Sequence, residues 1–270
     1  MTDDRDNYIE IRPIAHIHSP FPEKFGIPRQ SGLAENRAEI HFLPDFRSVD
    51  SVRGMEGFDY LWLIWGFSAN RRESTFQPTV RPPRLGGNTR MGVFATRSPF
   101  RPNGLGLSSV RILSIDLTGE DAPVITVEGA DLMDGTPIYD IKPYIPYADA
   151  HENTRGGFTD SYSGGSYRLQ VVVDDSLWES LDDSEAASIS YGQNSLKEAS
   201  KASVQESPDE SPAQTFRKIL PELKSVLSED PRPSYQHDPA RIYGMKYEGF
   251  NVHFRVEDGT LHIVSAEECP

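Results

Sequence analysis

The feature that most constrains the fold is a continuous apolar and aromatic run at residues 57–67, Gly-Phe-Asp-Tyr-Leu-Trp-Leu-Ile-Trp-Gly-Phe. The run has the length of one strand, and such a composition is typical of a strand that is buried on both faces or enclosed in a barrel. Further short β segments are predicted at residues 9–18, 37–42, 91–96, 105–115, 124–129 and 168–173. Because these short strands come with few helical stretches, the sequence favours a mainly β fold with a β-barrel, which the last segment closes.

A second unusual stretch lies at residues 92–111, where prolines and glycines interrupt a strand-like pattern. Pro99 and Pro102 fix φ and favour an extended conformation in the residues before them, and Asn103-Gly104 permits the positive φ of a tight turn. We expect a rigid loop that exposes its backbone to a ligand. The alternative is an ordinary strand connection with solvated arginines.

The C-terminal part has a different composition. Residues 174–212 are rich in Ser, Glu, Asp and Ala and carry ten acids against two lysines, which predicts a flexible linker, with a fraying helix over 187–202. Apolar residues then recur at helical spacing over 216–227, and two alternating segments flank an Asp-Gly turn at 258–259. The predicted domains are a barrel at 8–173, a linker at 174–212 and a small α+β domain at 213–270.

Composition excludes several classes of protein. No apolar stretch approaches the roughly 20 residues of a membrane helix, and the N-terminus is polar and acidic, so we expect a soluble, cytoplasmic protein. Cys269 is the single cysteine, which excludes an internal disulfide framework and a thiolate metal cluster within one chain. His16 and His18 alternate along one predicted strand, but without a third ligand nearby we predict no metal site.

The net charge of −14 is unevenly distributed. Residues 68–111 contain eight arginines, no lysine and one acid. Since the planar guanidinium suits phosphates and stacked bases, this segment is compatible with an RNA-facing surface, and a salt-bridged loop is the alternative. The candidate RNA-binding residues are Arg71, Arg72, Arg81, Arg84, Arg90 and Arg101.

Four ordered motifs carry a resemblance to a known family. They are the loop at residues 14–30, the aromatic run that begins at Gly57, the Pro/Gly loop at 96–107, and Gly-Ala-Asp-Leu-Met-Asp-Gly-Thr-Pro at 129–137 with the Tyr-rich stretch after it. Together they closely resemble the TsaA-like, or TrmO, family over about residues 8–155, and the C-terminal part is similar to the domain appended in its longer bacterial members.

The resemblance implies a β-barrel that binds S-adenosylmethionine and transfers its methyl group to N6 of threonylcarbamoyladenosine, next to the anticodon of certain tRNAs. It also implies a homodimer. The cofactor-binding residues that it implies are Pro28, Arg29, Gln30, Ser68, Ala69, Arg97, Leu107, Asp131, Leu132, Met133 and Asp134. Many members of the family carry His at the position of Ser68, so this chain departs from the pattern there.

The residue types fit such a cofactor, which presents a carboxylate, a ribose diol, an amine and an adenine. Arg97 or Arg29 can pair with the carboxylate, and Asp131 or Asp134 can accept hydrogen bonds from the ribose or the amine. The residues Leu107, Leu132 and Met133 can wall the adenine. Core packing is the alternative for Leu107 and Met133, and turn capping is the alternative for the two aspartates.

No catalytic base is assigned from the sequence. Methyl transfer depends mainly on an in-line approach and on desolvation. The possible proton acceptors are Tyr139, Asp140, Tyr144 and Tyr147. The aromatic residues Trp62, Trp65 and Phe67 can stack bases, but their apolar context favours the core. Two other functions remain open: methyl transfer to another RNA or a small molecule, and a non-catalytic RNA-binding module.

Overall fold

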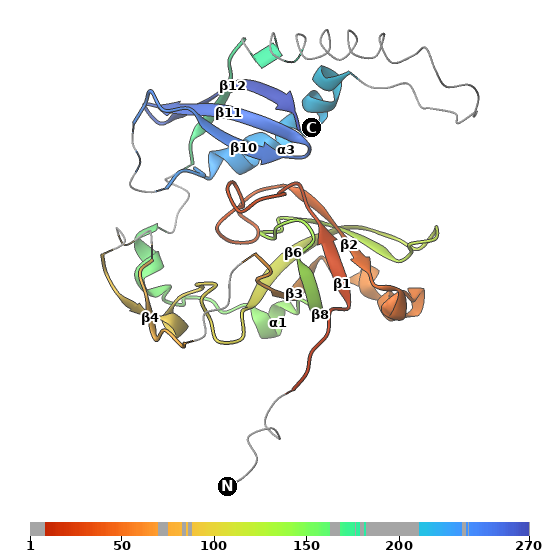
Figure 1. Cartoon of the computed structure of the whole chain (residues 1–270). Helices are drawn as coiled ribbons and strands as arrows, with labels where there is room; N and C mark the ends of the chain where they lie inside the picture. Colours follow the sequence, from red (N-terminus) through yellow and green to blue (C-terminus); the bar gives the residue numbers. More distant parts are fainter. Residues whose placement is uncertain are drawn as a thin grey trace, which may run out of the picture. The chain divides into compact units, whose positions relative to one another are not determined.

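Six strands close into an antiparallel barrel in the order β1-β2-β7-β6-β3-β8 (Figure 1). These are β1 (Ala15–His18), β2 (Arg37–Phe42), β3 (Tyr60–Gly66), β6 (Leu105–Asp116), β7 (Val124–Glu128) and β8 (Pro137–Pro143). The computed structural model describes residues 9–69, 75–82, 85, 88–162, 168–175, 177, 178, 181, 211–233, 236 and 238–269. The predicted barrel is confirmed.

The barrel core consists of side chains at alternate positions of the strands. On β3, the aromatic strand, Leu61 and Leu63 are fully buried and Trp65 nearly so. They pack with fully buried Ile17, Ile40, Ile125 and Ile138 from four other strands. The apolar run at 57–67 therefore lies in the barrel wall, as predicted.

The strand that closes the barrel differs from the prediction. Residues 168–173 do not join it: β9 (Gln170–Val173) pairs in parallel with β12 (Thr260–Glu268) in a second sheet. The closing strand is β8, which pairs with both β1 and β3. Its prolines, Pro137 and Pro143, lie at the two ends of the strand, where a missing N–H is tolerated. In the sequence, the same prolines argue against a strand, so β8 was not predicted.

The segment 91–96 also differs from the prediction. Only β5 (Met91–Gly92) is a strand, and it pairs with β4 (Thr79–Val80) outside the barrel. A 3₁₀ turn follows at Val93–Ala95. Short helical turns lie at Pro44–Phe46, Val49–Val52, Met55–Gly57, α1 (Pro146–Asp149) and Gly157–Tyr162.

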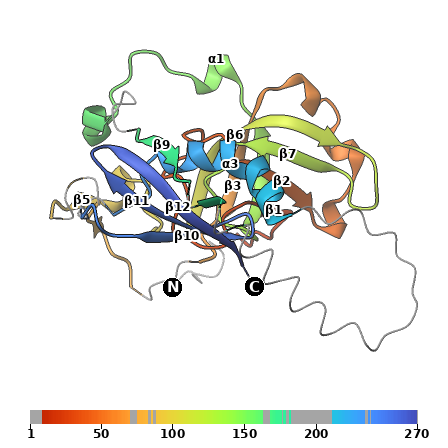
Figure 2. The same cartoon turned by 90° about the horizontal axis from the view of Figure 1, so that it is seen from above.

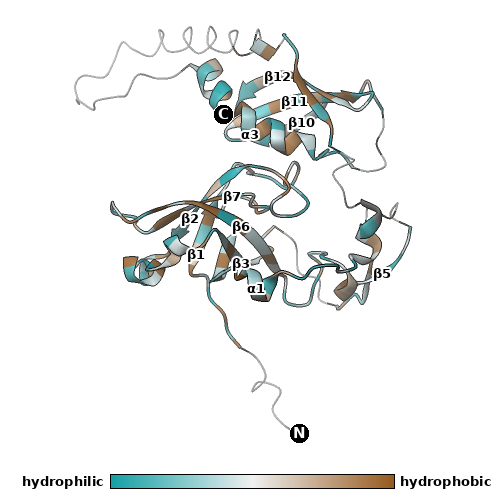
Figure 3. Cartoon of the chain, turned by 180° about the vertical axis from the view of Figure 1, so that it is seen from behind, coloured by the Kyte–Doolittle hydropathy of each residue, from teal (hydrophilic) through white to brown (hydrophobic). Residues whose placement is uncertain are grey.

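The second sheet has the order β10-β11-β12-β9 (Figure 2). The strands β10 (Tyr243–Tyr247) and β11 (Phe250–Glu257) precede β12, and α3 (Pro212–Ser228) packs its apolar residues against the same core. Apolar and polar residues alternate along β11 (Figure 3). The predicted Asp-Gly hairpin is confirmed, since Asp258 and Gly259 both have positive φ between β11 and β12.

The chain forms two compact units that do not follow the sequence order. Unit 1 combines the N-terminal residues through Ser19 with Arg29–Gly32 and Arg37–Thr154. Unit 2 combines Pro20–Pro28 and Leu33–Asn36 with the chain from Arg155 onward. Much of the N-terminal Pro/Gly-rich loop is therefore part of the unit that contains the C-terminal sheet.

The core of unit 2 shows why this loop is needed there. Phe21 is fully buried and meets the ring of Tyr247 edge to face at 5.6 Å, and the ring of Phe25 stacks on that of Phe254 at 6.5 Å. A Cβ built on Gly26, which has φ +94°, would collide with the side chain of Met245. A tight turn of the loop thus packs against β10 and β11.

The start predicted for the linker, residue 174, lies before residues that belong to the core of unit 2. Leu177 and Leu181 are both fully buried in the core of unit 2, where they join apolar residues of α3 and of the sheet. Most of the segment 174–212, including the helix expected at 187–202, lies outside the described residues.

Candidate functional site

Three segments of unit 1 place polar side chains close together. The first is the loop 29–32, which hydrogen bonds join to the barrel on both sides. The N–H of Ser109 on β6 donates to Ser31 Oγ at 3.1 Å, and the N–H of Gly32 donates to the carbonyl of Gly129 at 2.9 Å. These bonds fix the backbone that presents Arg29 and Gln30.

The second segment is the Pro/Gly loop. Its predicted tight turn is confirmed: Gly104 has φ +60°, and its N–H donates to the carbonyl of Arg101 at 3.2 Å. The N–H of Phe67 donates to the carbonyl of Gly104 at 2.9 Å, which places this turn beside the end of β3. At the other end of the loop, the guanidinium of Arg97 donates to the side-chain carbonyl of Gln30. The first two segments therefore meet through side chains.

The third segment is the turn after β7. Ser19 Oγ donates to the carbonyl of Leu132 at 2.8 Å, and the N–H of Ser19 donates to Asp134 Oδ1 at 3.1 Å. The N–H of Gly135 donates to the carbonyl of Ile17 at 2.9 Å. These bonds to the end of β1 hold the turn that carries Asp131.

Asp131 has the most perturbed environment of the three segments. Burial raises the pKa of its carboxyl above the ordinary value. A hydrogen bond from the Ser108 hydroxyl, at 2.5 Å, opposes this rise, and so do the charge of Arg97 and the backbone N–H of Ser31. Such carboxylates are common at functional sites: burial destabilises the charged form, and a nearby cation stabilises it.

The donor set fits S-adenosylmethionine. Arg97 is exposed and offers a planar cation for a carboxylate, Asp131 offers an acceptor for a hydroxyl or an ammonium group, and Gln30 offers an amide. Leu107 is 57% exposed on the outer face of β6, so it offers apolar surface. The arrangement can bind a small zwitterion that has an apolar part.

The other predicted cofactor residues fall into separate environments. Leu132 was expected to wall the adenine, but its side chain is buried in the barrel core and does not line an open site. It faces inward, as does Ala130 beside it. Met133 is partly buried and Asp134 exposed. Ser68 and Ala69 are exposed after β3, and Pro28 is buried within unit 2. Their binding roles stay predictions.

The predicted RNA-binding arginines are only partly described. Arg71, Arg72 and Arg84 lie outside the described residues. Arg81 and Arg90 are exposed. The guanidinium of Arg101 donates to the carbonyls of Thr96 at 2.8 Å and Val93 at 3.4 Å, and it lies over the ring of Phe94. Arg101 therefore holds the fold of its own loop.

The histidines that alternate on β1 are both outside the barrel core, His16 partly buried and His18 exposed. His18 Nδ1 lies 3.5 Å from Asp134 Oδ1, and its ring meets that of His41 edge to face. Among the described residues no group of three or more His, Cys, Asp or Glu side chains is arranged to hold a metal ion. Nor is any helix within the described residues long and apolar enough to cross a membrane.

The aromatic residues divide between core and surface. Trp65 is buried in the barrel, as its apolar context predicted, and packs edge to face on Phe67. Trp62 is half-buried on the outer face of β3, where its indole donates to Asp149 Oδ2 at 3.0 Å and packs against Tyr144. Tyr147 is 91% exposed. The candidate acceptor Asp140 pairs with Lys142 at 2.9 Å.

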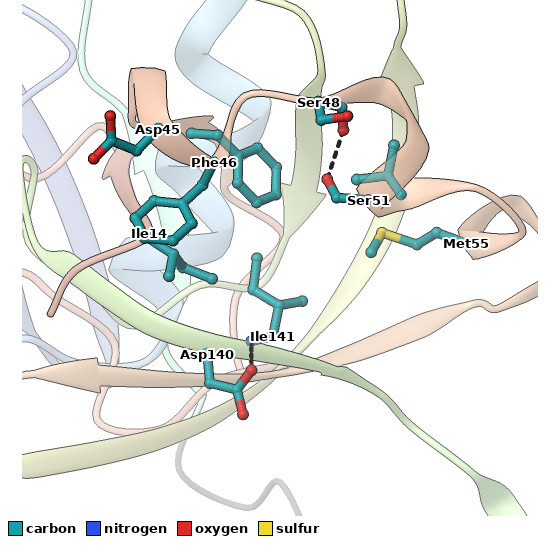
Figure 4. A pocket seen from close by; sticks show the side chains of 10 residues that line it. Ile14, Asp45, Phe46, Ser48, Ser51, Met55, Asp140 and Ile141 are labelled. Carbon is teal, nitrogen blue, oxygen red and sulfur yellow. Dashed lines mark hydrogen bonds between the residues drawn. The ribbon is translucent and has the colours of Figure 1, made fainter. Parts of the chain in front are cut away.

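A separate pocket of about 370 Å³ lies elsewhere on unit 1 (Figure 4). Its walls are mainly apolar, with carboxylates at Asp45 and Asp140. Its lining residues are Ile14, Phe42, Asp45, Phe46, Ser48, Ser51, Val52, Met55, Asp140 and Ile141. Because it includes none of the predicted cofactor residues, the hollow and the polar constellation are different sites.

The sequence reasoning missed Ser108 and the serines that tie the segments together. Ser108 is 1% exposed and bonds to both Trp65 and Asp131. The available signal was its spacing: it lies two residues after Gly106, at an inward-facing position of a predicted strand, where a serine needs a polar partner.

Comparisons with known proteins agree with this fold. The chain is 37% identical over 265 residues to the tRNA (adenine(37)-N6)-methyltransferase of Escherichia coli K12, covering 96% of this chain and 97% of the relative. It is 36% identical over 247 residues to a putative S-adenosylmethionine-dependent methyltransferase of Pseudomonas aeruginosa PAO1, covering 90% and 91%. A crystal structure of TrmO from P. aeruginosa superposes with a TM-score of 0.67 at 28% identity, covering 97% of this chain and 98% of that one.

Two family models match the chain and together span most of it. The tRNA-methyltransferase O N-terminal domain matches residues 16–150, which include the barrel and all three site segments. The TrmO C-terminal domain matches residues 195–268, which include α3 and the strands β10 to β12. The chain therefore belongs to the TrmO family of tRNA methyltransferases.

Proposed function

We propose that the protein uses S-adenosylmethionine to methylate N6 of adenine 37 in tRNA, with threonylcarbamoyladenosine as the acceptor nucleoside. The observation that carries the cofactor part is the meeting of Gln30, Arg97 and Asp131 from three separate segments of the barrel unit. The relatives named as methyltransferases of adenine 37 support the acceptor position. The threonylcarbamoyl group rests on the family resemblance.

Each cofactor-binding residue has a role that its chemistry supports. Arg97 pairs with the carboxylate of the cofactor, because its exposed guanidinium is free to form a two-pronged bond beyond its contact with Gln30. Asp131 accepts hydrogen bonds from the amine or from the ribose hydroxyls. Leu107 and Met133 contact the adenine.

The chemistry needs little from the side chains beyond position. When bound, S-adenosylmethionine supplies a methyl group on a positively charged sulfur that a nitrogen can attack. The residues of this chain hold the two reactants in line and exclude water, which accounts for much of the rate of such reactions. The N6 proton of the acceptor is acidified by the adjoining carbonyl, so a strong base is not required, and we assign none.

Two surfaces complete the proposal. Arg81 and Arg90 are exposed on the arginine-rich segment and contact tRNA phosphates. Phe76 and Phe94 stack at 6.0 Å between ring centroids, and both are more than half exposed. Because grouped exposed apolar rings mark interaction sites, we propose that they lie in a homodimer interface. We also propose a cytoplasmic location, because a tRNA substrate supports it.

The test is an assay with purified protein and S-adenosylmethionine on two matched tRNA pools, one carrying threonylcarbamoyladenosine and one lacking it. Nucleoside mass spectrometry should show one added methyl group on that nucleoside, in the first pool only. Methylation in both pools would shift the acceptor to unmodified adenine. Cofactor binding without methylation in either pool would point to another acceptor, and absence of binding would favour a non-catalytic RNA-binding module.

A further inference from the structure

An indole, a hydroxyl and a carboxylate form a continuous chain of hydrogen bonds inside unit 1. Trp65 Nε1 on β3 donates to Ser108 Oγ on β6 at 2.9 Å, and Ser108 Oγ donates to Asp131 Oδ1 at 2.5 Å. Trp65 is 7% exposed and Ser108 is 1% exposed. The chain therefore runs from the barrel core to the carboxylate at the proposed cofactor site.

The chain has a fixed direction. An indole N–H can only donate, and an ionised carboxylate can only accept, whereas a serine hydroxyl has a single proton. Because Ser108 Oγ accepts from Trp65, its proton points at Asp131. The second bond is short, as expected for a hydroxyl that donates to a charged oxygen.

A glycine lets the indole reach this serine. In the antiparallel pairing of β3 with β6, Trp65 lies opposite Gly106 and Leu63 lies opposite Ser108. A Cβ built on Gly106 would overlap the six-membered ring of Trp65. The missing side chain thus allows the indole to lie across β6 and present its N–H to the next inward-facing residue.

The same serine affects the ionisation of Asp131. Burial raises the pKa of this carboxyl, and the Ser108 hydrogen bond is the largest of the effects that lower it. The bond therefore favours the charged form, in which both oxygens accept hydrogen bonds. Oδ1 is engaged by Ser108, and the backbone N–H of Ser31 also bonds to the carboxylate.

We propose that Ser108 and Trp65 are positioning residues that hold Asp131 ionised and correctly oriented, so that it accepts a hydrogen bond from an ammonium or hydroxyl group of the cofactor. This inference rests on the proposed function, which places S-adenosylmethionine at Asp131. It adds that the Trp65 indole N–H and the side-chain gap at Gly106 are required for cofactor affinity, although neither residue contacts the cofactor.

The experiment measures S-adenosylmethionine affinity by calorimetry and steady-state KM values with full-length protein. Ser108→Ala removes the donor and should raise the Kd and the KM for the cofactor about tenfold, leaving the KM for tRNA unchanged. Ser108→Thr keeps a hydroxyl and should restore most of the affinity. Trp65→Phe keeps an aromatic ring without the N–H, and should weaken binding a few-fold. Ser114→Ala, an exposed serine further along β6, is the matched control and should change nothing.

A purely structural role would give a different result. Less folded protein would lower kcat equally for both substrates, with each KM unchanged. Wild-type Kd values in folded Ser108→Ala and Trp65→Phe would overturn the positioning role while the proposed function stands. If the wild type itself does not bind S-adenosylmethionine, the proposed function fails and this inference with it. Binding that survives Asp131→Asn would overturn the assignment of Asp131 and, with it, the positioning role of Ser108 and Trp65, whereas cofactor binding by the protein would stand.

Discussion

The two units assemble their cores in opposite ways. Every barrel strand lies between Ala15 and Pro143, and the site segments are the connections next to those strands. Unit 2 combines its C-terminal sheet with Pro20–Pro28, about 220 residues earlier in the chain. The comparison teaches that one short N-terminal loop has two roles. Residues 20–28 contribute to the core of unit 2, and Arg29–Gly32 belongs to unit 1, at the proposed cofactor site.

The largest effect is expected from the part of the loop that lies in unit 2. Phe21→Ala should remove about 3–5 kcal/mol from the free energy of unfolding of unit 2, because the side chain is fully buried against Tyr247. Hydrogen exchange should show the loss of protection in β10 to β12. Phe58→Ala, at a phenylalanine that is 39% exposed on unit 1, is the control. Loss of protection confined to the barrel strands would contradict the assignment of this loop.

A glycine in the same loop gives a sharper version of this test. Gly26→Ala combines a strained positive φ with a collision against Met245, and should destabilise unit 2 by about 1–3 kcal/mol in urea denaturation. Gly119→Ala has a similar φ of +90° with open space around its Cβ, so it isolates the backbone contribution. Equal losses in the two variants would mean that Gly26 does not pack against β10.

Arg97 provides the test of the proposed cofactor binding by the barrel unit. Arg97→Ala should weaken S-adenosylmethionine binding about 10- to 100-fold, since it removes a charge-assisted hydrogen bond to the cofactor. Calorimetry measures this, and the variant should still fold because the Arg97 side chain is exposed. Arg90→Ala, at another exposed arginine of unit 1, serves as the control. Unchanged affinity in Arg97→Ala would remove this residue from the site.

Asp131 should show a conflict between stability and function. Its pKa is raised in the folded state, so the ionised carboxylate is destabilising above that pKa, and the penalty disappears as pH falls toward the ordinary value. Asp131→Asn should therefore unfold at higher urea than the wild type at neutral pH, with the difference shrinking on acidification, while cofactor binding is lost. A less stable variant at neutral pH would mean that Ser108 and Arg97 outweigh burial.

The smallest effect is expected on the RNA-facing surface. Replacing Arg81 and Arg90 together with Ala should lower tRNA affinity a few-fold and reduce the slope of log affinity against log salt by about 1 to 2. Cofactor affinity should not change, because both side chains lie outside the proposed cofactor contacts. A salt slope equal to that of the wild type would exclude contacts of these arginines with phosphates.

The comparison also shows what the sequence can predict. Strand periodicity identified most of the barrel, because each strand alternates its own residues between core and surface. It missed β8, because the prolines at both ends of this strand are untypical of a strand. It also assigned β9 to the barrel, because periodicity does not report which strand a segment pairs with. The role of Phe21 in unit 2 depends on contacts with a distant segment, so no local pattern reports it.

The site was predictable to a similar degree. Motif resemblance placed Gln30, Arg97 and Asp131 together, and the structure brings them together through a hydrogen bond and a charge interaction. The sequence did not show that Leu132 faces the core, because one turn residue has no period to interpret. It also missed Ser108, whose role follows from the indole across the strand.

Hydrogen exchange of the intact protein with and without S-adenosylmethionine tests the central claim, that the barrel unit holds the cofactor through three loop segments. The account predicts new protection at residues 29–32, 97–107 and 131–134, with β10 to β12 and the pocket residues Phe42 to Met55 unchanged. Protection centred on that pocket or on the C-terminal sheet, with the three segments unaffected, would contradict it.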